Sequence, residues 1–290
     1  MQVLRAITEL RAAREALPAG ARVGLVPTMG YLHAGHLSLV AQARRECDVV
    51  VVSIFVNPTQ FGPNEDLSRY PRDEARDLAL LAPAGVDWVF APPASEIYPP
   101  GFQTAVEVRD VTRVLEGAAR PGHFSGVATV VAKLFNIAQP HTAYFGQKDA
   151  QQVVVIRRMA RDLNFPVRIV TGATVREPDG LALSSRNVYL NPAERQAALV
   201  LSRALAAARA RWDAGERDGA ALRAAMQATL AAEPLAHPDY VSVADPETLL
   251  ELEETAPGQA ALASLAVRIG RGTRLIDNTL LEAADAPGRA

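Results

Sequence analysis

The feature that most constrains the fold is a regular alternation of short apolar runs with longer amphipathic stretches through residue 172. The run DVVVVSIFVN (48–57) is continuous, apolar and β-branched, a pattern typical of a strand buried on both faces. It follows a short apolar run at 22–27 and an amphipathic stretch at 36–47, so a strand, a helix and a strand are predicted in succession. The alternation continues with predicted strands at 86–93, 142–146 and 166–172 and predicted helices at 125–139 and 149–164. We therefore expect a doubly wound parallel sheet with helices on both faces.

After about residue 175 the pattern changes to two alanine-rich helices and several short strands. The helices are predicted at 191–216 and 218–234, with Asn191 and Asp218 as N-caps. Short strands are predicted within DYVSVADP, LAVRIGRG and TRLIDNTL. The expected fold class is α/β, divided into a Rossmann-like domain at 1–174 and a smaller C-terminal α+β domain at 175–290.

Composition bounds the function before any motif is considered. The 290 residues carry a formal net charge of -2 at pH 7, so no basic excess favours nucleic acid or an acidic membrane surface. The single cysteine excludes an internal disulfide bond and fits a reducing compartment. The first twenty residues mix arginine with glutamate and have no apolar block, unlike a signal peptide. We expect a cytoplasmic globular protein with no nucleic-acid or membrane partner.

The segment PTMGYLHAGH (27–36) places His33 and His36 between a predicted strand and a predicted helix. In a doubly wound sheet, ligands bind outside the carboxyl ends of the strands. A helix N-terminus there offers unpaired amide donors and partial positive charge, which suit phosphate, and imidazoles add further donors. Gly35 would leave room for a flat base against the backbone. Two other interpretations stay open at this point. One is a structural turn with two surface histidines, and the other is a metal site, for which no third ligand cluster of suitable spacing appears.

Polar side chains follow two further predicted strands at the same edge. Asn57, Gln60 and Tyr70 lie in the loop after 48–57, and uncharged amides beside an aromatic ring suit a small hydroxylated substrate. YFGQKDAQQ (144–152) contains Lys148, one of only two lysines among 30 basic residues. A lysine retained in so arginine-rich a chain indicates a specific task for a compact charge on a flexible stem.

Two weaker segments complete the candidate site. GLALSSRN (180–187) is a small-polar and basic loop at the predicted domain boundary, suited to closing over a triphosphate. RPGHFSGV (120–127) places Arg120 and His123 just before a predicted helix. Each segment alone is ordinary loop chemistry, and only their combination is specific.

An early HxGH motif and a late serine-arginine loop are similar to the paired signatures of the nucleotidyltransferase superfamily. Within it, PTMGYLHAGH, FVNPTQF, RPGHFSGV, YFGQKDAQQ and GLALSSRN, in this order and spacing, resemble the pantoate–β-alanine ligase (pantothenate synthetase) family over essentially the whole chain. The resemblance implies an AMP-forming ligase of pantothenate and coenzyme A biosynthesis that uses ATP as substrate and Mg2+. Pantoate carboxylate attacks the α-phosphate of ATP to give pantoyl adenylate and pyrophosphate. The amine of β-alanine then attacks the adenylate, giving pantothenate and AMP. A homodimer is also implied.

The same resemblance implies roles for individual residues. Four are expected to be catalytic: His36, His33, Lys148 and Arg186, with His36 matching the residue usually named as proton donor. The expected ATP-binding set is Met29, Gly30, His33, His36, Gly146, Lys148, Asp149, Val175, Leu183, Ser184, Ser185 and Arg186. The expected set for pantoate and β-alanine is Gln60, Gln152, Asn57, Tyr70 and Arg120. No protein ligand is assigned to magnesium, because phosphate oxygens and water commonly hold this ion.

The chain departs from the usual family pattern at two positions. Gln147 stands where glutamate is common, which removes a charge but keeps the length and an acceptor. Leu183 stands where methionine is usual, a nearly volume-conserving exchange.

Three alternatives compete with the ligase interpretation. A nucleotidyltransferase acting on a phosphorylated alcohol would keep HxGH, but it should bind its acceptor with arginine or lysine rather than with Asn57, Gln60 and Gln152. A non-catalytic nucleotide sensor should have lost its phosphate-facing groups, whereas this chain retains both histidines and Lys148. A class I aminoacyl-tRNA synthetase should carry an anticodon-binding extension or a basic face, and the sequence shows neither.

Overall fold

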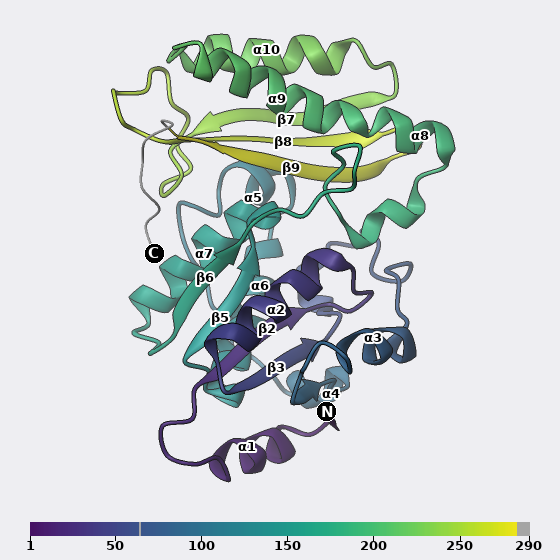
Figure 1. The fold of residues 1–290 in the computed structure, drawn as a ribbon, viewed down its shortest axis with the longest axis vertical. Helices are drawn as coiled ribbons and strands as arrows, with labels where there is room; N and C mark the ends of the chain where they lie inside the picture. The colour runs from purple at the N-terminus through teal and green to yellow at the C-terminus, as the bar shows by residue number, and fades with distance from the viewer. Residues whose placement is uncertain (64, 283–290) are drawn as a thin grey trace.

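The computed structural model describes residues 1–63 and 65–282, and its strands form one large and one small sheet (Figure 1). Within the described residues the large sheet has six strands, and every neighbouring pair is parallel. In spatial order they are β1 (Gln2–Leu4), β4 (Trp88–Phe90), β3 (Val49–Ile54), β2 (Val23–Thr28), β5 (Thr142–Gly146) and β6 (Arg168–Gly172). The predicted doubly wound parallel sheet is confirmed.

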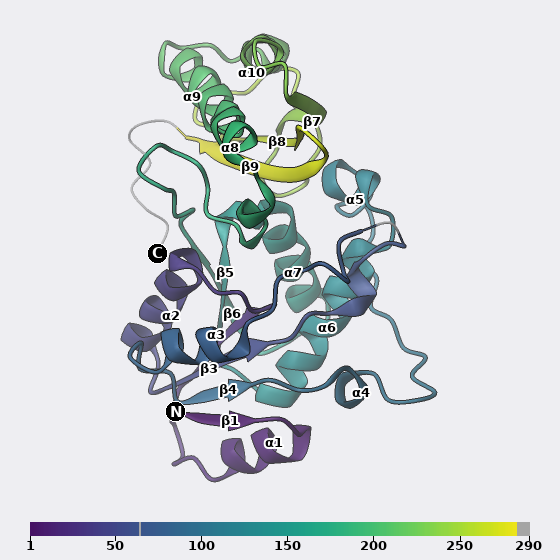
Figure 2. The same cartoon turned by 90° about the vertical axis from the view of Figure 1, so that its right-hand side faces the viewer.

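The sheet is buried on both faces because its central strands send alternate side chains into two separate cores. Val51 of β3 belongs to one core, and its neighbours Val50 and Val52 belong to the other. Figure 2 shows the helices on the two sides of the sheet. Packed on the first core are α1 (Ile7–Glu15), α4 (Ala94–Ile97), α5 (Leu115–Ala119), α6 (His123–Ala138) and α7 (Ala150–Asp162). On the other core lie α2 (Ala34–Glu46) and α3 (Glu74–Leu81).

The C-terminal part of the chain forms a three-stranded antiparallel sheet covered by helices. The strands, in spatial order, are β7 (Ala236–Ala244), β8 (Ala261–Ile269) and β9 (Thr273–Leu281), and the helices are α8 (Pro192–Ala197), α9 (Leu199–Asp213) and α10 (Gly219–Ala231). The predicted caps are confirmed, since Asn191 accepts from the N–H of Glu194 and Asp218 accepts from the N–H of Ala220. The single helix predicted over 191–216 is wrong, because Ala198 (ψ −19°) tightens the backbone between α8 and α9.

The order of the strands determines where a ligand can bind. The chain runs from β2 outward through β3 to β4, and returns to pair β5 with the other side of β2. The two directions diverge between β2 and β5, and such switch points are the usual ligand-binding crevices of doubly wound sheets. Short 3₁₀ segments follow at this edge: η1 (Pro58–Gln60), η2 (Gln147–Asp149) and η3 (Ser185–Tyr189).

The amino-terminal pair β1 and α1 was not predicted. β1 is only three residues long and becomes a strand by pairing with β4, more than eighty residues away in sequence.

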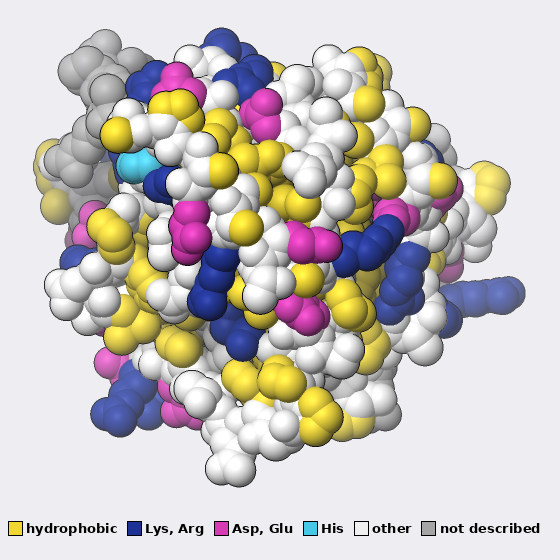
Figure 3. All heavy atoms as spheres, turned by 90° about the horizontal axis from the view of Figure 1, so that it is seen from below, with side chains coloured by type: hydrophobic (Ala, Val, Ile, Leu, Met, Phe, Trp, Pro, Cys, Tyr) yellow, Lys and Arg dark blue, Asp and Glu magenta, His cyan; other side chains and the backbone are white. Residues whose placement is uncertain are grey.

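In the part of the chain that the structure describes, no helix is long and apolar enough to span a bilayer. On the face seen from below, basic and acidic side chains are interspersed among hydrophobic and neutral ones (Figure 3).

Candidate active site

The carboxyl ends of the central strands open onto a cavity of about 210 Å³ at the switch point. The loops after β2, β3, β5 and β6 line it, together with the segment 183–186. Every residue predicted for the site lines this cavity except Gly30: Met29, His33, His36, Asn57, Gln60, Tyr70, Arg120, Gly146, Lys148, Asp149, Gln152, Val175, Leu183, Ser184, Ser185 and Arg186. The structure therefore brings five segments that are distant in sequence to one place.

The spacing of the two histidines is that of a helix capping box. His33 is the N-cap of α2, and its Nδ1 accepts from the N–H of Gly35 at 3.1 Å. His36 is the third helical residue, and its Nδ1 accepts from the N–H of His33 at 3.3 Å. Each ring thus satisfies a helix N–H that would otherwise lack a partner. Because both Nδ1 atoms accept, the remaining proton of each neutral ring lies on Nε2, which is left as a donor for the cavity.

Both histidines are neutral at physiological pH. Burial lowers the pKa of His33 to about 4, and the Lys148 ammonium contributes further. Burial lowers the pKa of His36 to about 3, helped by His33 and Lys148. The two rings lie close together, with centroids 4.0 Å apart, so charging one would oppose charging the other. At neutral pH this pair therefore supplies hydrogen-bond donors and not full charges.

The glycines of the HxGH segment make room for protein groups. A Cβ at Gly35 would come within 2.9 Å of the His33 ring, so this glycine lets the cap fold back over the helix. Gly35 also lines the cavity, so the expectation that it leaves space for a base stays a prediction. Gly30 has φ +79°, and a Cβ there would come within 3.0 Å of Asp77. A glycine tolerates both that conformation and that proximity.

Asp77 of α3 holds the loop between β2 and α2, and sequence patterning did not single it out. Its carboxylate is 1% exposed and accepts 2.7 Å hydrogen bonds from the N–H groups of Tyr31 and Leu32. The signal was weak, because an acidic residue in a helix is ordinary, and its partners lie more than forty positions earlier. Asp77 is a support for the HxGH loop and does not line the cavity.

The amide side of the cavity is a hydrogen-bonded cluster. Asn57 donates to Gln60 Oε1 at 3.0 Å and to the carbonyl of Gly126 at 3.1 Å, and its Oδ1 accepts from the Tyr98 hydroxyl at 2.8 Å. Gln60 Nε2 contacts the sulfur of Met29 at 3.3 Å. Asn57 and Gln60 are both buried. Gln60 is consequently held in one orientation, with Asn57 as its brace.

Arg120 and His123 line the cavity on the same side as the amide cluster. Arg120 Nε donates to Glu65 at 2.8 Å and Nη1 to His123 Nε2 at 3.1 Å, while His123 Nδ1 donates to the Gln60 carbonyl at 2.8 Å. Arginine only donates and a carbonyl only accepts, so this His123 is the neutral Nδ1–H tautomer. Burial, followed by the Arg120 charge, lowers the pKa of His123 to about 4.

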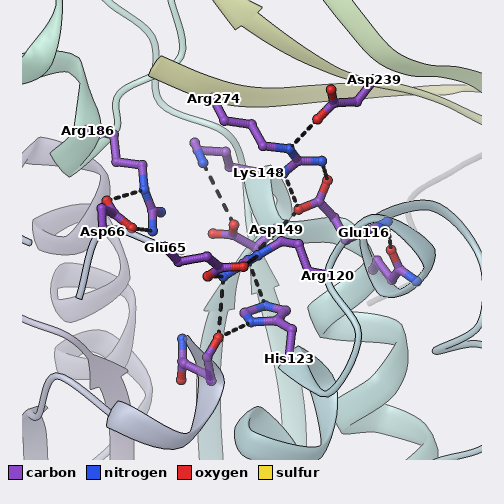
Figure 4. A network of polar contacts seen from close by, with 12 residues as sticks. Glu65, Asp66, Glu116, Arg120, His123, Lys148, Asp149, Arg186, Asp239 and Arg274 are labelled. Atoms are coloured by element: carbon purple, nitrogen blue, oxygen red, sulfur yellow. Dashed lines mark hydrogen bonds and ion pairs between the residues drawn. The ribbon is translucent and has the colours of Figure 1, made fainter. Parts of the chain in front are cut away.

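The β5 segment and the serine-arginine loop lie on the histidine side. Lys148 Nζ is 3.7 Å from an Asp149 oxygen, and its side chain remains 19% exposed to the cavity. Ser185 donates to the carbonyl of Tyr31 at 3.1 Å. Arg186 makes two 2.9 Å hydrogen bonds to Asp66 (Figure 4). Its guanidinium also packs 5.5 Å from the centre of the Tyr70 ring.

Gln147, one of the two departures from the family pattern, points toward the small sheet. Its amide donates to Asn278 Oδ1 at 3.0 Å, and Asn278 in turn donates to the carbonyls of Gln147 and Lys148. The residue therefore connects η2 with β9 of the small sheet. The second lysine, Lys133, lies 4.7 Å from the centre of the Phe102 ring.

Neither the open turn nor the metal interpretation of the histidines fits the geometry. The His36 side chain is half-buried and its Nδ1 accepts from the N–H of His33, so it is not an exposed surface histidine. Among residues 1–63 and 65–282 no cluster of three or more histidine, cysteine, aspartate or glutamate side chains could hold a metal ion.

Comparisons with known proteins agree with one another. The family model described as pantoate-beta-alanine ligase matches residues 2–280. Pantothenate synthetase of Roseiflexus castenholzii is 67% identical over 283 residues, covering 98% of this chain and 100% of that protein. The crystal structure of pantothenate synthetase from Thermus thermophilus superposes with a TM-score of 0.92 at 54% identity, covering 98% of this chain and 100% of that one. A pantoate-beta-alanine ligase structure from Francisella tularensis, complexed with beta-gamma ATP and beta-alanine, has a TM-score of 0.79 at 36% identity, covering 99% and 100%.

Proposed function

The chain belongs to the pantoate-beta-alanine ligase family, and from this we propose that it condenses pantoate with β-alanine to pantothenate, converting ATP to AMP and pyrophosphate. One observation carries the proposal. A single cavity at the switch point is lined on one side by donors suited to phosphate and on the other by uncharged amides suited to a hydroxy acid. An adenylating ligase requires this pairing.

The first step joins the pantoate carboxylate to the α-phosphorus of ATP and releases pyrophosphate. In-line attack needs alignment and stabilisation of developing charge, and no enzyme nucleophile. His33 and His36 supply Nε2–H donors that are already oriented by their capping bonds. Lys148 and Arg186 supply full positive charge on the phosphate oxygens. Because the neutral histidines keep their donors at every pH above about 5, this stabilisation needs no proton transfer from them.

The acceptor side is assigned to Gln60 and Gln152, which grip the hydroxyl and carboxylate groups of pantoate. Asn57, Tyr70 and Arg120 complete this set. In the second step the amine of β-alanine attacks the carbonyl of the adenylate, and AMP leaves with the bonding electrons. The rival acceptor, a phosphorylated alcohol, would be expected to meet arginine or lysine where this cavity is lined by the amides of Asn57, Gln60 and Gln152.

The residues present fit ATP, and Mg2+ would accompany its phosphates. Thr174 Oγ1 is buried without a hydrogen-bond partner in the described structure, and Thr174 lines the cavity, so it offers an unsatisfied polar atom to a nucleotide. The rest of the nucleotide site is formed by Met29, Gly30, Gly146, Asp149, Val175 and 183–185. Asp149 is the carboxylate paired with Lys148, the lysine proposed to face the phosphates. Phosphate oxygens and water would provide most ligands of a magnesium ion. When bound, the ion would neutralise phosphate charge.

Three further properties belong to the same proposal. The chain divides at 174/175, and the small domain carries the SSRN segment as a lid over the nucleotide. The enzyme is a homodimer, and it acts in the cytoplasm. Sedimentation of the purified protein measures the oligomeric state directly.

Product analysis tests the proposed function. The protein is incubated with ATP, magnesium, pantoate and β-alanine, and pantothenate and AMP are quantified by mass spectrometry. The account expects equal amounts of the two products and none when pantoate is omitted. Formation of ADP in place of AMP, or of a nucleotide-linked product that persists after β-alanine is added, would contradict it.

A further inference from the structure

An arginine of the small sheet reaches across to the large domain and binds a buried carboxylate. Arg274 of β9 donates two 2.6 Å hydrogen bonds to Glu116 of α5 (Figure 4). Both side chains are largely buried, with 17% of Arg274 and 7% of Glu116 exposed. A bidentate pair between two planar groups is the strongest form of such a contact. Among the described residues on this side of the cavity, no shorter ion pair joins the part of the chain that forms the large sheet to the part that forms the small sheet.

The carboxylate of Glu116 also faces a second arginine. Arg120 Nη1 lies 3.9 Å from Glu116 Oε2, too far for a hydrogen bond but close enough for strong attraction at a buried site. Arg120 is instead turned toward Glu65, His123 and the Gln60 carbonyl (Figure 4). Glu116 thus has two possible cationic partners, and Arg274 occupies its oxygens.

We propose that Arg274 is a positioning residue for the acceptor side of the cavity: by satisfying Glu116, it leaves Arg120 directed toward His123 and Gln60. This rests on the proposed function only in identifying pantoate as the acceptor that Gln60 binds. It assigns the small domain a second task, since the lid segment 183–186 faces the nucleotide whereas Arg274 acts on the acceptor.

The physical basis is the cost of an unpaired buried charge. A buried carboxylate that loses its partner is strongly destabilised and takes the nearest available cation. Without Arg274, that cation is Arg120. Its rotation toward Glu116 would break the bonds to His123 and to the carbonyl of Gln60, and the amide that grips the acceptor would lose its support.

The test compares two arginines that share one partner. Arg274 Nε and Arg268 Nε both donate to Asp239, at 2.6 and 2.9 Å, but only Arg274 reaches Glu116. Arg274→Met is expected to raise the KM for pantoate about tenfold, a size typical of coupling between separate sites, and the KM for ATP less than about twofold. Arg268→Met is the matched control and should change neither. Equal increases in both KM values for Arg274→Met would overturn the proposal.

A double variant separates positioning from simple loss of an interdomain contact. In Arg274→Met/Glu116→Gln no unpaired carboxylate remains to attract Arg120, so the KM for pantoate should return most of the way to its original value. If the contact only held the domains together, the double variant would be at least as impaired as Arg274→Met. That result would overturn the proposal.

Two measurements keep the outcome decisive. If Arg274→Met does not fold, Arg274→Lys retains a cation and should raise the KM for pantoate by an intermediate factor, while an unchanged KM counts against the proposal. A crystal structure of either variant is independent of the activity. Arg120 is expected within hydrogen-bond distance of Glu116, and an Arg120 still bonded to Glu65 and His123 would overturn the inference even if the acceptor were not pantoate.

Discussion

At the scale of single residues, His36 combines a structural and a chemical task in one ring. Its Nδ1 caps α2, and its Nε2–H is the donor that we propose for the phosphates. The two tasks can be separated, because glutamine is a normal third residue of a capping box and can accept from the N–H of His33. A glutamine at that position cannot also present the Nε2–H donor at the same point in the cavity.

His36→Gln is therefore expected to keep the melting temperature while lowering turnover by about 100-fold or more, as for other preorganised donors. Thermal denaturation and steady-state kinetics measure the two effects. His237→Ala, at an exposed position of β7, is the control and should retain both stability and turnover. Normal turnover of His36→Gln would show that this histidine is a cap only.

The buried histidines also make a prediction about pH. The folded-state pKa values of His33, His36 and His123 are lowered to about 4, 3 and 4, whereas an unfolded histidine titrates near 6.5. Below pH 6.5 the unfolded chain therefore binds more protons than the folded one, and stability falls as pH falls until the folded-state pKa values are reached.

Each of these histidines changes the free energy of unfolding by at most about 1.4 kcal/mol per pH unit. The free energy of unfolding in urea, measured between about pH 7.5 and 5, should decline from about pH 6.5 downward, before most carboxylates titrate. His36→Gln should show a shallower decline than the original chain. A flat profile over this range would mean that these rings are already accessible to protons in the folded state.

At the scale of elements, the contact between α6 and η1 positions Gln60. A Cβ added at Gly126 would lie 2.4 Å from the carbonyl oxygen of Thr59 and 2.7 Å from the backbone nitrogen of Gln60. In an ordinary helix interior, replacing glycine by alanine stabilises by up to about 1 kcal/mol. Here the clash is with backbone, which cannot move away cheaply.

Gly126→Ala should instead lower the free energy of unfolding by about 1–3 kcal/mol, as overpacking does. It should also raise the KM for pantoate, because η1 is displaced. Gly62→Ala is the control, since among the described residues a Cβ there meets no atom closer than 3.7 Å. Urea denaturation measures the free energy of unfolding of both variants, and kinetic titration with pantoate measures their KM. A stabilised Gly126→Ala with unchanged KM would refute the positioning role of this contact.

Elements with a strong local pattern could be predicted from the sequence, and elements defined by distant partners could not. β3 is recognisable because burial on both faces requires a continuous apolar run. β1 is too short to carry a pattern and exists through its pairing with β4. The break at Ala198 between α8 and α9 has no proline or glycine to signal it.

The site follows the same division. Many of the residues that line the cavity lie in short motifs after β2, β3 and β5, so their convergence follows from the parallel sheet, and the structure places them together. The residues that hold them do not follow from local spacing. Asp77, Glu116 and Arg274 act across 45 to 158 positions of sequence, and their roles depend on burial and on the partner's orientation. Long-range pairing of this kind leaves no local signature.

At the scale of the whole molecule, residues from both the large-sheet part and the C-terminal part of the chain meet around the cavity. Arg186 of η3 is paired with Asp66, and Arg274 of the small sheet is paired with Glu116 (Figure 4). In addition, Asn278 of β9 binds the backbone of η2, next to Lys148. The C-terminal part of the chain thus contacts both of the sides proposed for nucleotide and for acceptor in one cavity. As a phosphate ligand, Arg186 would exchange its bonds to Asp66 for bonds to ATP, which couples nucleotide binding to the position of the lid.

The central claim is that this one cavity activates a hydroxy acid by adenylation. The most direct measurement is exchange of labelled pyrophosphate into ATP with the purified protein and magnesium, with β-alanine omitted. The account predicts exchange that depends on pantoate, because formation of the adenylate is reversible and needs no amine. Absence of exchange under conditions where ATP binds, or exchange that is independent of pantoate, would contradict it.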